Sequence, residues 1–183
     1  MTKPPPPVWQ IRPERTADAA AVEALNAKSF GPGRFAKAAY RLREGVDPVG
    51  ALSFVAVEDD KLYGSIRFWP VTVGKEASLL LGPLAVEPAL RGQGIGVALM
   101  RHGIEEARLL GAASIILVGD ELYYVRVGFS RLPPGKIHFP GPVDEARVLG
   151  LSLKPNARLT LSGEVRRARI DHPFCACGAA TVG

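Results

Sequence analysis

Residues 91–96 read RGQGIG, so that three glycines alternate with other residues directly after an arginine. The apolar run that ends at Val86 is typical of a strand, and residues 94–110 have the apolar spacing of an amphipathic helix. A helix start presents unpaired N–H groups and the positive end of the helix dipole, and glycine lets a ligand approach them closely. We therefore expect a strand–loop–helix unit whose loop suits a diphosphate, with Arg91 adding a full charge at its mouth.

The residues of this loop alone leave more than one interpretation open. One is a glycine-rich turn that binds no ligand. Another is the dinucleotide fingerprint G-x-G-x-x-G with an acidic residue about 20 positions later, and Asp120 does follow the next expected strand. Val97, however, stands where that pattern has its last glycine, and the remaining chain is short for a full dinucleotide-binding sheet. A third interpretation, an acyl-CoA site, depends on more of the chain.

The 183 residues suit one domain with a substantial core. Runs of apolar residues separated by turn residues predict strands that alternate with helices, and hence an α/β domain. The expected helix 94–110 has its apolar stripe at Val97, Met100, Ile104 and Ala107. The expected strands are 8–12, 51–58, 61–73, 77–88, 114–118 and 146–153, and the expected helices are 16–30, 35–45 and 94–110.

The expected strand 77–88 contains an internal proline, Pro83. Proline cannot donate to a sheet ladder and is confined to edges and bulges. Gly82-Pro83 therefore predicts a bulge, or a place where this strand parts from its neighbour. That neighbour is the continuous apolar run 114–118, which is typical of a strand buried on both faces.

Composition divides the chain into three parts. Residues 1–7 contain consecutive prolines and predict a flexible, extended lead-in. Residues 8–155 hold the expected strands and helices of the domain, and residues 156–183 are charged or rich in small residues, which predicts a poorly ordered tail. The tail holds His172, Cys175 and Cys177 without a fourth ligand at suitable spacing, so we expect no metal site.

The net charge of +5 favours anionic partners of any kind. No basic stripe is interleaved with aromatic residues, so we expect no nucleic-acid partner. No apolar run approaches about 18 residues, so we expect no membrane span. The N-terminus lacks the apolar core of a secretory signal and the two cysteines form no disulfide framework, which favours a reducing cytoplasm.

A wider pattern surrounds the glycine loop. LAVEPALRGQGIGVALM (84–100) resembles the signature of the Gcn5-related N-acetyltransferases (GNAT): an apolar strand, V-x-P-x-x-R-G-x-G-I-G and an apolar helix. IRPERTADAAAVEALNAKSF (11–30) is similar to the first strand and helix of that family, and Tyr124-x-x-x-Gly128-Phe129 matches its Y-x-x-x-G-F box. LGPLAV (81–86), GDELYYVRVGF (119–129) and PVDEARVLGLSL (142–153) together resemble a bacterial subgroup of mostly unassigned substrate. The resemblance covers about residues 9–153 and implies a mixed, splayed sheet flanked by helices.

The resemblance also implies an activity, the transfer of an acetyl group from the co-substrate acetyl-CoA to a primary amine by direct attack. The loop and helix start would bind the diphosphate, and the pantetheine arm would add to the preceding strand as an extra strand. An N–H near Leu84 would stabilise the oxyanion, and Tyr124 would protonate the leaving thiolate. The implied cofactor-binding residues are Leu84, Ala85, Val86, Arg91, Gly92, Gln93, Gly94, Ile95 and Gly96.

Proton transfer sets conditions on these roles. A phenol with a pKa of about 10 is a weaker acid than a thiol near about 8.5, so Tyr124 helps only if its pKa is lowered or if transfer accompanies bond cleavage. The amine must also lose a proton, and its base stays open among water and several side chains. The candidates are Glu58, Glu76, Glu87, Asp120 and His138. Many GNAT members carry Asn and Ala on the approach to this tyrosine, whereas here the approach is Gly119-Asp120-Glu121-Leu122, which puts contacts to the CoA arm on that side in doubt.

The expected helices between residues 17 and 45 lie where the family forms its acceptor wall, which makes Arg34 and Phe35 candidate substrate contacts. The acceptor itself is left open between a small amine, an antibiotic, a peptide N-terminus and a lysine, and a homodimer is compatible with the sequence. The alternative from another class is a non-catalytic acyl-CoA-binding sensor on the same fold. Only an enzyme would release free thiol when it is offered amines.

Overall fold

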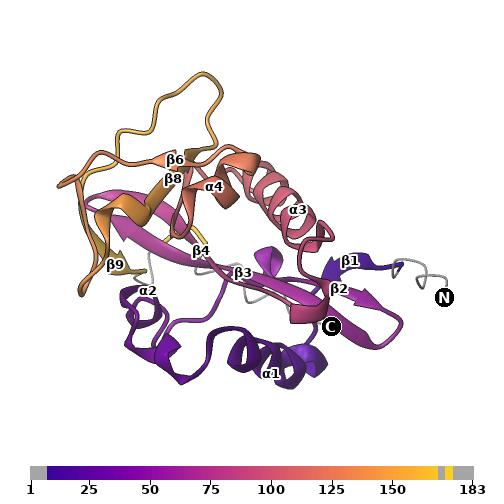
Figure 1. The fold of residues 1–183 in the computed structure, drawn as a ribbon. Helices are drawn as coiled ribbons and strands as arrows, with labels where there is room; N and C mark the ends of the chain where they lie inside the picture. The colour runs from indigo at the N-terminus through magenta and orange to yellow at the C-terminus, as the bar shows by residue number, and fades with distance from the viewer. Residues whose placement is uncertain (1–7, 169–171, 175–183) are drawn as a thin grey trace.

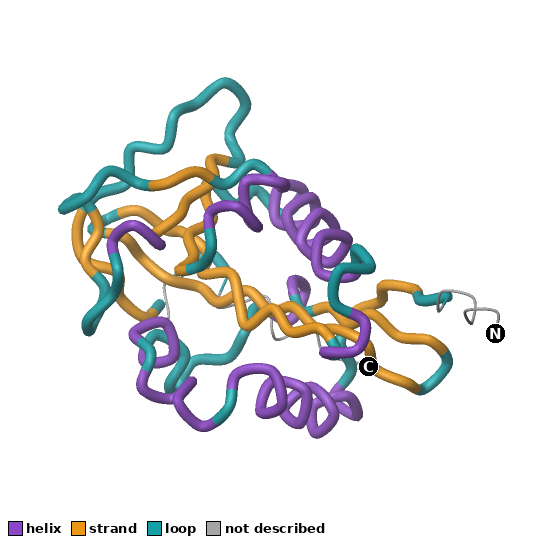
Figure 2. Tube along the Cα trace, in the orientation of Figure 1, coloured by secondary structure: helices purple, strands orange, loops and turns teal. Residues whose placement is uncertain are grey.

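A computed structural model describes residues 8–168 and 172–174, without the side chains of residues 35 and 36. A mixed sheet lies at the centre, with α3 and α4 on one face and α1 and α2 on the other (Figure 1; Figure 2). The strands are β1 (Gln10–Pro13), β2 (Phe54–Glu58), β3 (Lys61–Val73), β4 (Glu76–Val86), β5 (Ser114–Val118), β6 (Ser130–Arg131), β7 (Ile137–His138), β8 (Val148–Ser152) and β9 (Gly163–Arg167). The helices are α1 (Ala19–Phe30), α2 (Ala38–Arg41), α3 (Ile95–Leu109) and α4 (Glu121–Tyr124).

The sheet has the order β1-β2-β3-β4-β5-β8-β6, in which all neighbours are antiparallel except β4 and β5. The long hairpin of β3 and β4 forms its centre, and a turn at Asp59-Asp60 joins β2 to β3. The observed β3 matches the expected strand 61–73, and β5 matches 114–118. The predicted α/β class and the mixed sheet flanked by helices are therefore confirmed.

The predicted irregularity at Gly82-Pro83 is present in β4. Ile66 lies opposite Leu84 and Phe68 lies opposite Leu81, so β4 has two residues where β3 has one. The indole Nε1 of Trp69 on β3 donates a 2.6 Å hydrogen bond to the carbonyl oxygen of Gly82, which anchors the bulge.

The parallel pairing of β4 with β5 is confined to Leu79 and Leu80 among the described residues. Beyond Leu80 the two strands part, as the internal proline predicted. The second half of β4 therefore has an unpaired edge, which faces the gap that opens between the strands.

Helix α3 covers one face of the sheet. Its expected apolar stripe of Val97, Met100, Ile104 and Ala107 is buried, with exposures of 8% or less. Gly103 on the same side of the helix lies directly over the Phe68 ring, since a Cβ atom added there would be 2.5 Å from the ring. The absence of a side chain at this position lets the helix pack closely on β3.

Two segments differ from the expectations. The expected helix 35–45 is a short 3-10 turn followed by one α-helical turn, α2, whose Ala38 is buried against the sheet. Part of the expected tail is a strand, because β9 pairs with Val71–Val73 of β3 and with β7, and buries Val165. Among the described residues, every helix is too short or too polar to span a bilayer.

The C-terminal segment also packs beyond β9. His172 and Phe174 are buried, and the His172 ring forms a 2.9 Å hydrogen bond through Nε2 with the carbonyl oxygen of Val71. Cys175 and Cys177 lie outside the described residues, so the expectation about metal ligands there stays a prediction, as does the flexible lead-in of residues 1–7.

Replacement of Gly103 by alanine is expected to destabilise the protein. Alanine is about 1 kcal/mol better than glycine in a helix interior, but the added methyl group would press on the fully buried Phe68 ring. Overpacking of this kind costs about 1–3 kcal/mol. Denaturant unfolding of Gly103→Ala should show a net loss, which should shrink when the same change is made in a Phe68→Leu background. A gain of stability in the single variant would contradict this packing.

Candidate active site

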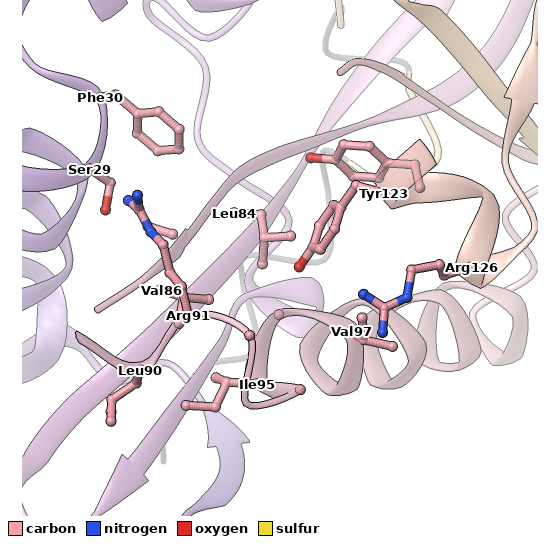
Figure 3. Close-up of a pocket in the computed structure, with 15 residues that line it drawn as sticks. Ser29, Phe30, Leu84, Val86, Leu90, Arg91, Ile95, Val97, Tyr123 and Arg126 are labelled. Carbon is pink, nitrogen blue, oxygen red and sulfur yellow. The ribbon is translucent and has the colours of Figure 1, made fainter. Parts of the chain in front are cut away.

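The gap between β4 and β5 continues into two cavities. The first, here called the loop cavity, has a volume of about 470 Å³ and lies between the end of β4, the start of α3 and helix α4 (Figure 3). Nearly all of the expected cofactor-binding residues line it, with Gln93 as the exception, and so does Tyr124. The lining residues from the prediction are Leu84, Ala85, Val86, Arg91, Gly92, Gly94, Ile95, Gly96 and Tyr124.

Two of the three loop glycines are required by the backbone. Gly92 and Gly94 have φ of +80° and +88°, a region that costs other residues about 1–2 kcal/mol. A Cβ atom at either position would meet nothing within 4 Å, so neither glycine is there to make room for another part of the chain. Gly94 is the N-cap of α3 and has no side-chain cap, and the first intrahelical bond runs from Ala98 N–H to its carbonyl oxygen. The N–H groups of the first turn therefore lie at the cavity without a cap.

The third glycine, Gly96, is required for a different reason, which is the space that a neighbouring side chain occupies. A Cβ atom there would lie 2.2 Å from the Tyr123 hydroxyl oxygen and 3.4 Å from the Val86 side chain. The phenol of Tyr123 thus packs against the first turn of α3 and forms part of the cavity wall (Figure 3). Tyr123 was not among the predicted site residues, although the tight spacing of the glycines was a signal that something packs there.

The positive charge at this cavity is not confined to Arg91. Figure 3 shows Arg91 on one side of the opening and Arg126 on the other, with Leu84 and Tyr123 between them. The Arg126 guanidinium lies 6.0 Å from the centroid of the Tyr123 ring. Both arginine side chains are exposed, so each is free to reorient and contact an anionic ligand. The sequence did not single out Arg126, because nothing in its spacing places it opposite the glycine loop.

Tyr124 is positioned by the start of α4. The Asp120 carboxylate accepts a 3.1 Å hydrogen bond from Leu122 N–H and caps this turn, and Asp120 also accepts from Tyr124 N–H through its carbonyl oxygen. The Tyr124 ring lies on Gly119, where a Cβ atom would be only 2.3 Å from it. Gly119 and Asp120, which depart from the pattern of many GNAT members, therefore set the place of this tyrosine.

The phenol of Tyr124 is a weaker acid than a free tyrosine. Burial raises its pKa to about 12, helped by Tyr123 and opposed by the charges of Arg43 and Arg147. The first of the two conditions for a full proton donor, a lowered pKa, is therefore not met. The hydroxyl stays protonated at neutral pH and can act as a hydrogen-bond donor.

The second cavity, here called the arginine cavity, has a volume of about 340 Å³ and lies on the α1 and α2 side of the sheet. Arg34, one of the two predicted substrate contacts, lines it, while the other, Phe35, has a described backbone in the turn Pro32–Ala36 but no described side chain. Phe30, Leu84 and Tyr124 line both cavities. The two spaces therefore meet at these residues.

The five candidate bases line neither cavity. Glu58 accepts a hydrogen bond from Tyr63, Glu87 forms an ion pair with Lys28, and Asp120 is the cap of α4. Glu76 and His138 are exposed on strands away from the cavities. The carboxylates that do line the arginine cavity, Glu23 and Asp144, were missed, because only the folded chain brings α1 next to the loop 142–147. Among the described residues no group of three His, Cys, Asp or Glu could hold a metal ion.

Comparisons with known proteins agree with this geometry. The model of the acetyltransferase (GNAT) family matches residues 19–129. The uncharacterized N-acetyltransferase YjhQ of Escherichia coli is 32% identical over 165 residues, which cover 85% of this chain and 90% of YjhQ.

Two solved structures have the same fold over nearly the whole chain. The E. coli GNAT protein YhbS, crystallised with CoA, is 29% identical with a TM-score of 0.74, over 92% of this chain and 93% of YhbS. A Brucella melitensis GNAT acetyltransferase, crystallised with acetyl-CoA, is 30% identical with a TM-score of 0.64, over 88% and 96% of the two chains.

The fold and the site together define an acyltransferase of the N-acetyltransferase class. More narrowly, the chain belongs to the GNAT family.

The contact of Gly96 with Tyr123 predicts a compensating pair of substitutions. Gly96→Ala should destabilise the protein by about 1–3 kcal/mol, because the methyl group displaces the Tyr123 hydroxyl. Tyr123→Phe removes that oxygen and leaves the ring carbon 3.5 Å from the new methyl group, an ordinary contact. The double variant should therefore recover most of the loss in a double-mutant cycle of denaturant unfolding. Additive losses would show that the two residues do not touch.

Proposed function

We propose that the protein transfers the acetyl group of acetyl-CoA to a primary amine by direct nucleophilic attack. The observation that carries the proposal is the meeting of two cavities at Leu84 and Tyr124. One cavity has the uncapped helix start that suits a diphosphate, and the other is a separate entrance to the same point. A donor and an acceptor could thus approach one another from opposite faces of the sheet.

The donor would bind along the loop cavity. The first-turn N–H groups of α3 and the Gly92–Gly94 backbone would hold the diphosphate, and Arg91 and Arg126 would add charge from both sides. The pantetheine arm would pair with the unpaired edge of β4 at Leu84, Ala85 and Val86, as an added strand does. This places the thioester at the point where the cavities meet.

The reaction would proceed without an acyl-enzyme. The amine nitrogen attacks the thioester carbonyl carbon, the C–S bond breaks, and the products are an amide and CoA thiol. A main-chain N–H at or next to Leu84 would donate to the oxyanion of the intermediate, and one such donor is worth about 3–4 kcal/mol. The proton released by the amine balances the one that the thiolate takes up.

Tyr124 would donate a hydrogen bond to the leaving sulfur. With its pKa near 12, complete proton transfer to a thiolate of pKa about 8.5 is uphill by about 5 kcal/mol. A hydrogen bond that strengthens as charge builds on sulfur needs no such transfer and still stabilises the transition state. The thiolate then takes its proton from the protonated nitrogen of the tetrahedral intermediate or from water.

The amine must enter as the free base. For an amine with a pKa of about 10.4, deprotonation at pH 7 costs roughly 4–5 kcal/mol. Glu23 is in an ion pair with Arg67, and Asp144 accepts from Ala146 N–H, so neither carboxylate of the arginine cavity is an unengaged base. Water in the open part of the cavity is therefore the proposed route for this proton.

The proposal predicts that a panel of primary amines releases CoA thiol from acetyl-CoA. Tyr124→Phe should lower kcat by about 10²-fold, the low end of the effect of removing one hydrogen-bond donor to developing charge, and leave the CoA dissociation constant nearly unchanged. Tyr63→Phe is the matched control, because the Tyr63 hydroxyl binds Glu58 away from both cavities. Thiol release by a colorimetric reagent and CoA titration by calorimetry measure the two quantities.

Two outcomes would count against the proposal. Tight CoA binding with no turnover of any amine would favour the acyl-CoA sensor. No heat on titration of CoA into folded protein would remove the donor site altogether.

The state of Tyr124 predicts the shape of the pH profile. Its hydroxyl is functional only below its pKa, which burial raises to about 12, so it stays protonated throughout pH 7–10. The free-base fraction of the amine rises with pH until its own pKa is passed. The value of kcat/KM should therefore rise with pH and level off once the pKa of the amine is passed. It should not decline at any pH up to 10, provided that circular dichroism shows folded protein. A descending limb in that range that Tyr124→Phe abolishes would show an ordinary or lowered pKa.

A further inference from the structure

One of the charged side chains that line the arginine cavity, Arg43, is not neutralised by a carboxylate of the described residues. Arg43 follows α2, next to the buried Leu42, and lines the cavity beside Trp69 and Gly82. Its guanidinium carbon lies 5.9 Å from the centroid of a Trp69 ring, and a Cβ atom at Gly82 would be 2.9 Å from Nη2. The guanidinium is thus held against the bulge of β4, close to the point where the cavities meet.

No ion pair between described residues includes Arg43, and its buried Nε has no hydrogen-bond partner among them. Burial lowers its pKa to about 10, so the side chain is still charged at neutral pH. A desolvated charge without an anionic partner is costly, and proteins rarely keep one without a use for it.

The neighbouring Arg67 shows what a neutralised cation in this cavity is like. Two of its nitrogens donate to the Glu14 carboxylate at 2.6 and 2.9 Å, and a third donates to Glu23 at 3.1 Å. The cavity walls hold more cations than carboxylates even with this pair included. The cations are Arg34, Lys37, Arg43, Arg67 and Arg147, and the carboxylates are Glu23 and Asp144.

A second group without a hydrogen-bond partner among the described residues lines the same cavity, and it is an acceptor where Arg43 is a donor. Asn26 on α1 is only 3% exposed, and its Oδ1 has no hydrogen-bond partner among the described residues. An amide oxygen can accept from the N–H of an amine, whereas the Arg43 guanidinium can donate only to an acceptor. The cavity thus offers one site for a hydrogen-bond donor and one for an anion.

We propose that the acceptor is a small amine that also carries an anionic group, a carboxylate or a phosphate, which Arg43 binds. The inference rests on the proposed amine acetylation and specifies its substrate class. A guanidinium fork matches either group with two parallel hydrogen bonds. The volume of about 340 Å³ is at the low end for ligand pockets and suits a molecule of about amino-acid size. Polyamines are disfavoured, because they would bring further cations next to Arg43 and Arg147.

The experiment compares acceptors that differ only in the anionic group. The proteinogenic amino acids with a primary amine are assayed beside their amides, phosphoethanolamine beside ethanolamine, and putrescine serves as a cationic amine, all by thiol release from acetyl-CoA. Amino-acid amides have the more acidic ammonium group and hence more free base at neutral pH, so intrinsic reactivity works against the expected order. We expect kcat/KM for the best acid to exceed that of its neutral partner at least about 10-fold, as for a hydrogen bond to a charged group.

Substitutions then test whether Arg43 is the cause. Arg43→Gln should bring the ratio of acid to neutral partner close to one, mainly through KM, and Arg43→Lys should restore part of it. Arg41→Gln is the matched control, since Arg41 lies two residues away, donates to the Pro140 carbonyl oxygen and does not line the cavity. Thermal unfolding and CoA titration of each variant show whether the fold and the donor site are intact.

The outcomes separate this inference from the function on which it rests. A preference for acids or phosphates that Arg43→Gln abolishes supports it. The comparison of amino acids with their amides and that of phosphoethanolamine with ethanolamine then identify which anion is bound. Turnover with neutral amines equal to or better than their anionic partners overturns it and leaves the acetyltransferase proposal in place, as does a preference that Arg43→Gln does not change. CoA binding without turnover of any amine overturns both.

Discussion

The parting of β4 from β5 beyond Leu80 is the constraint on which the rest of the site depends. A proline inside β4 cannot complete a ladder, and the one extra residue at the Gly82-Pro83 bulge turns the strand away from its parallel neighbour. Trp69 holds the bulge by donating to the Gly82 carbonyl oxygen. Because the strands separate, the sheet has an opening that both cavities reach, and a free strand edge lines it. A continuous sheet would have separated a donor on one face from an acceptor on the other.

The glycine loop owes its composition to two different physical causes. Gly92 and Gly94 have backbone angles that other residues resist and lie beside open space, which is the arrangement expected of a ligand-binding loop. Gly96 instead makes room for the Tyr123 hydroxyl, a contact within the protein. The same regular spacing in the sequence thus combines a binding requirement with a packing requirement, and only the neighbours of each residue distinguish them.

Burial shifts the pKa values of two groups near the point where the cavities meet, in opposite directions. It raises the pKa of Tyr124 to about 12 and lowers that of Arg43 to about 10, because desolvation disfavours the charged form of each. Both groups nevertheless keep their protons at neutral pH. A neutral hydroxyl and a guanidinium cation therefore line one small space, which suits a thiolate leaving group on one side and an anionic acceptor on the other. The Tyr124 phenol is accordingly suited to hydrogen bonding, and the lowered pKa that full proton donation would require is absent.

Features that depend on neighbours in the chain were readable from the sequence alone. The limits of β3 and β5, the buried stripe of α3 and the fault at Gly82-Pro83 follow from periodicity and from the missing N–H of proline, and family motifs led to Tyr124 and most of the loop cavity. Tertiary structure alone decided the rest: that Tyr123 fills the space over Gly96, that Arg126 faces Arg91, that Arg43 lacks a carboxylate, and that β9 completes the sheet. The physical reason is that periodicity and turn chemistry act over a few residues. Desolvation and charge neutralisation depend instead on groups that are far apart in sequence, such as Arg67 and Glu14, and meet only when the chain folds.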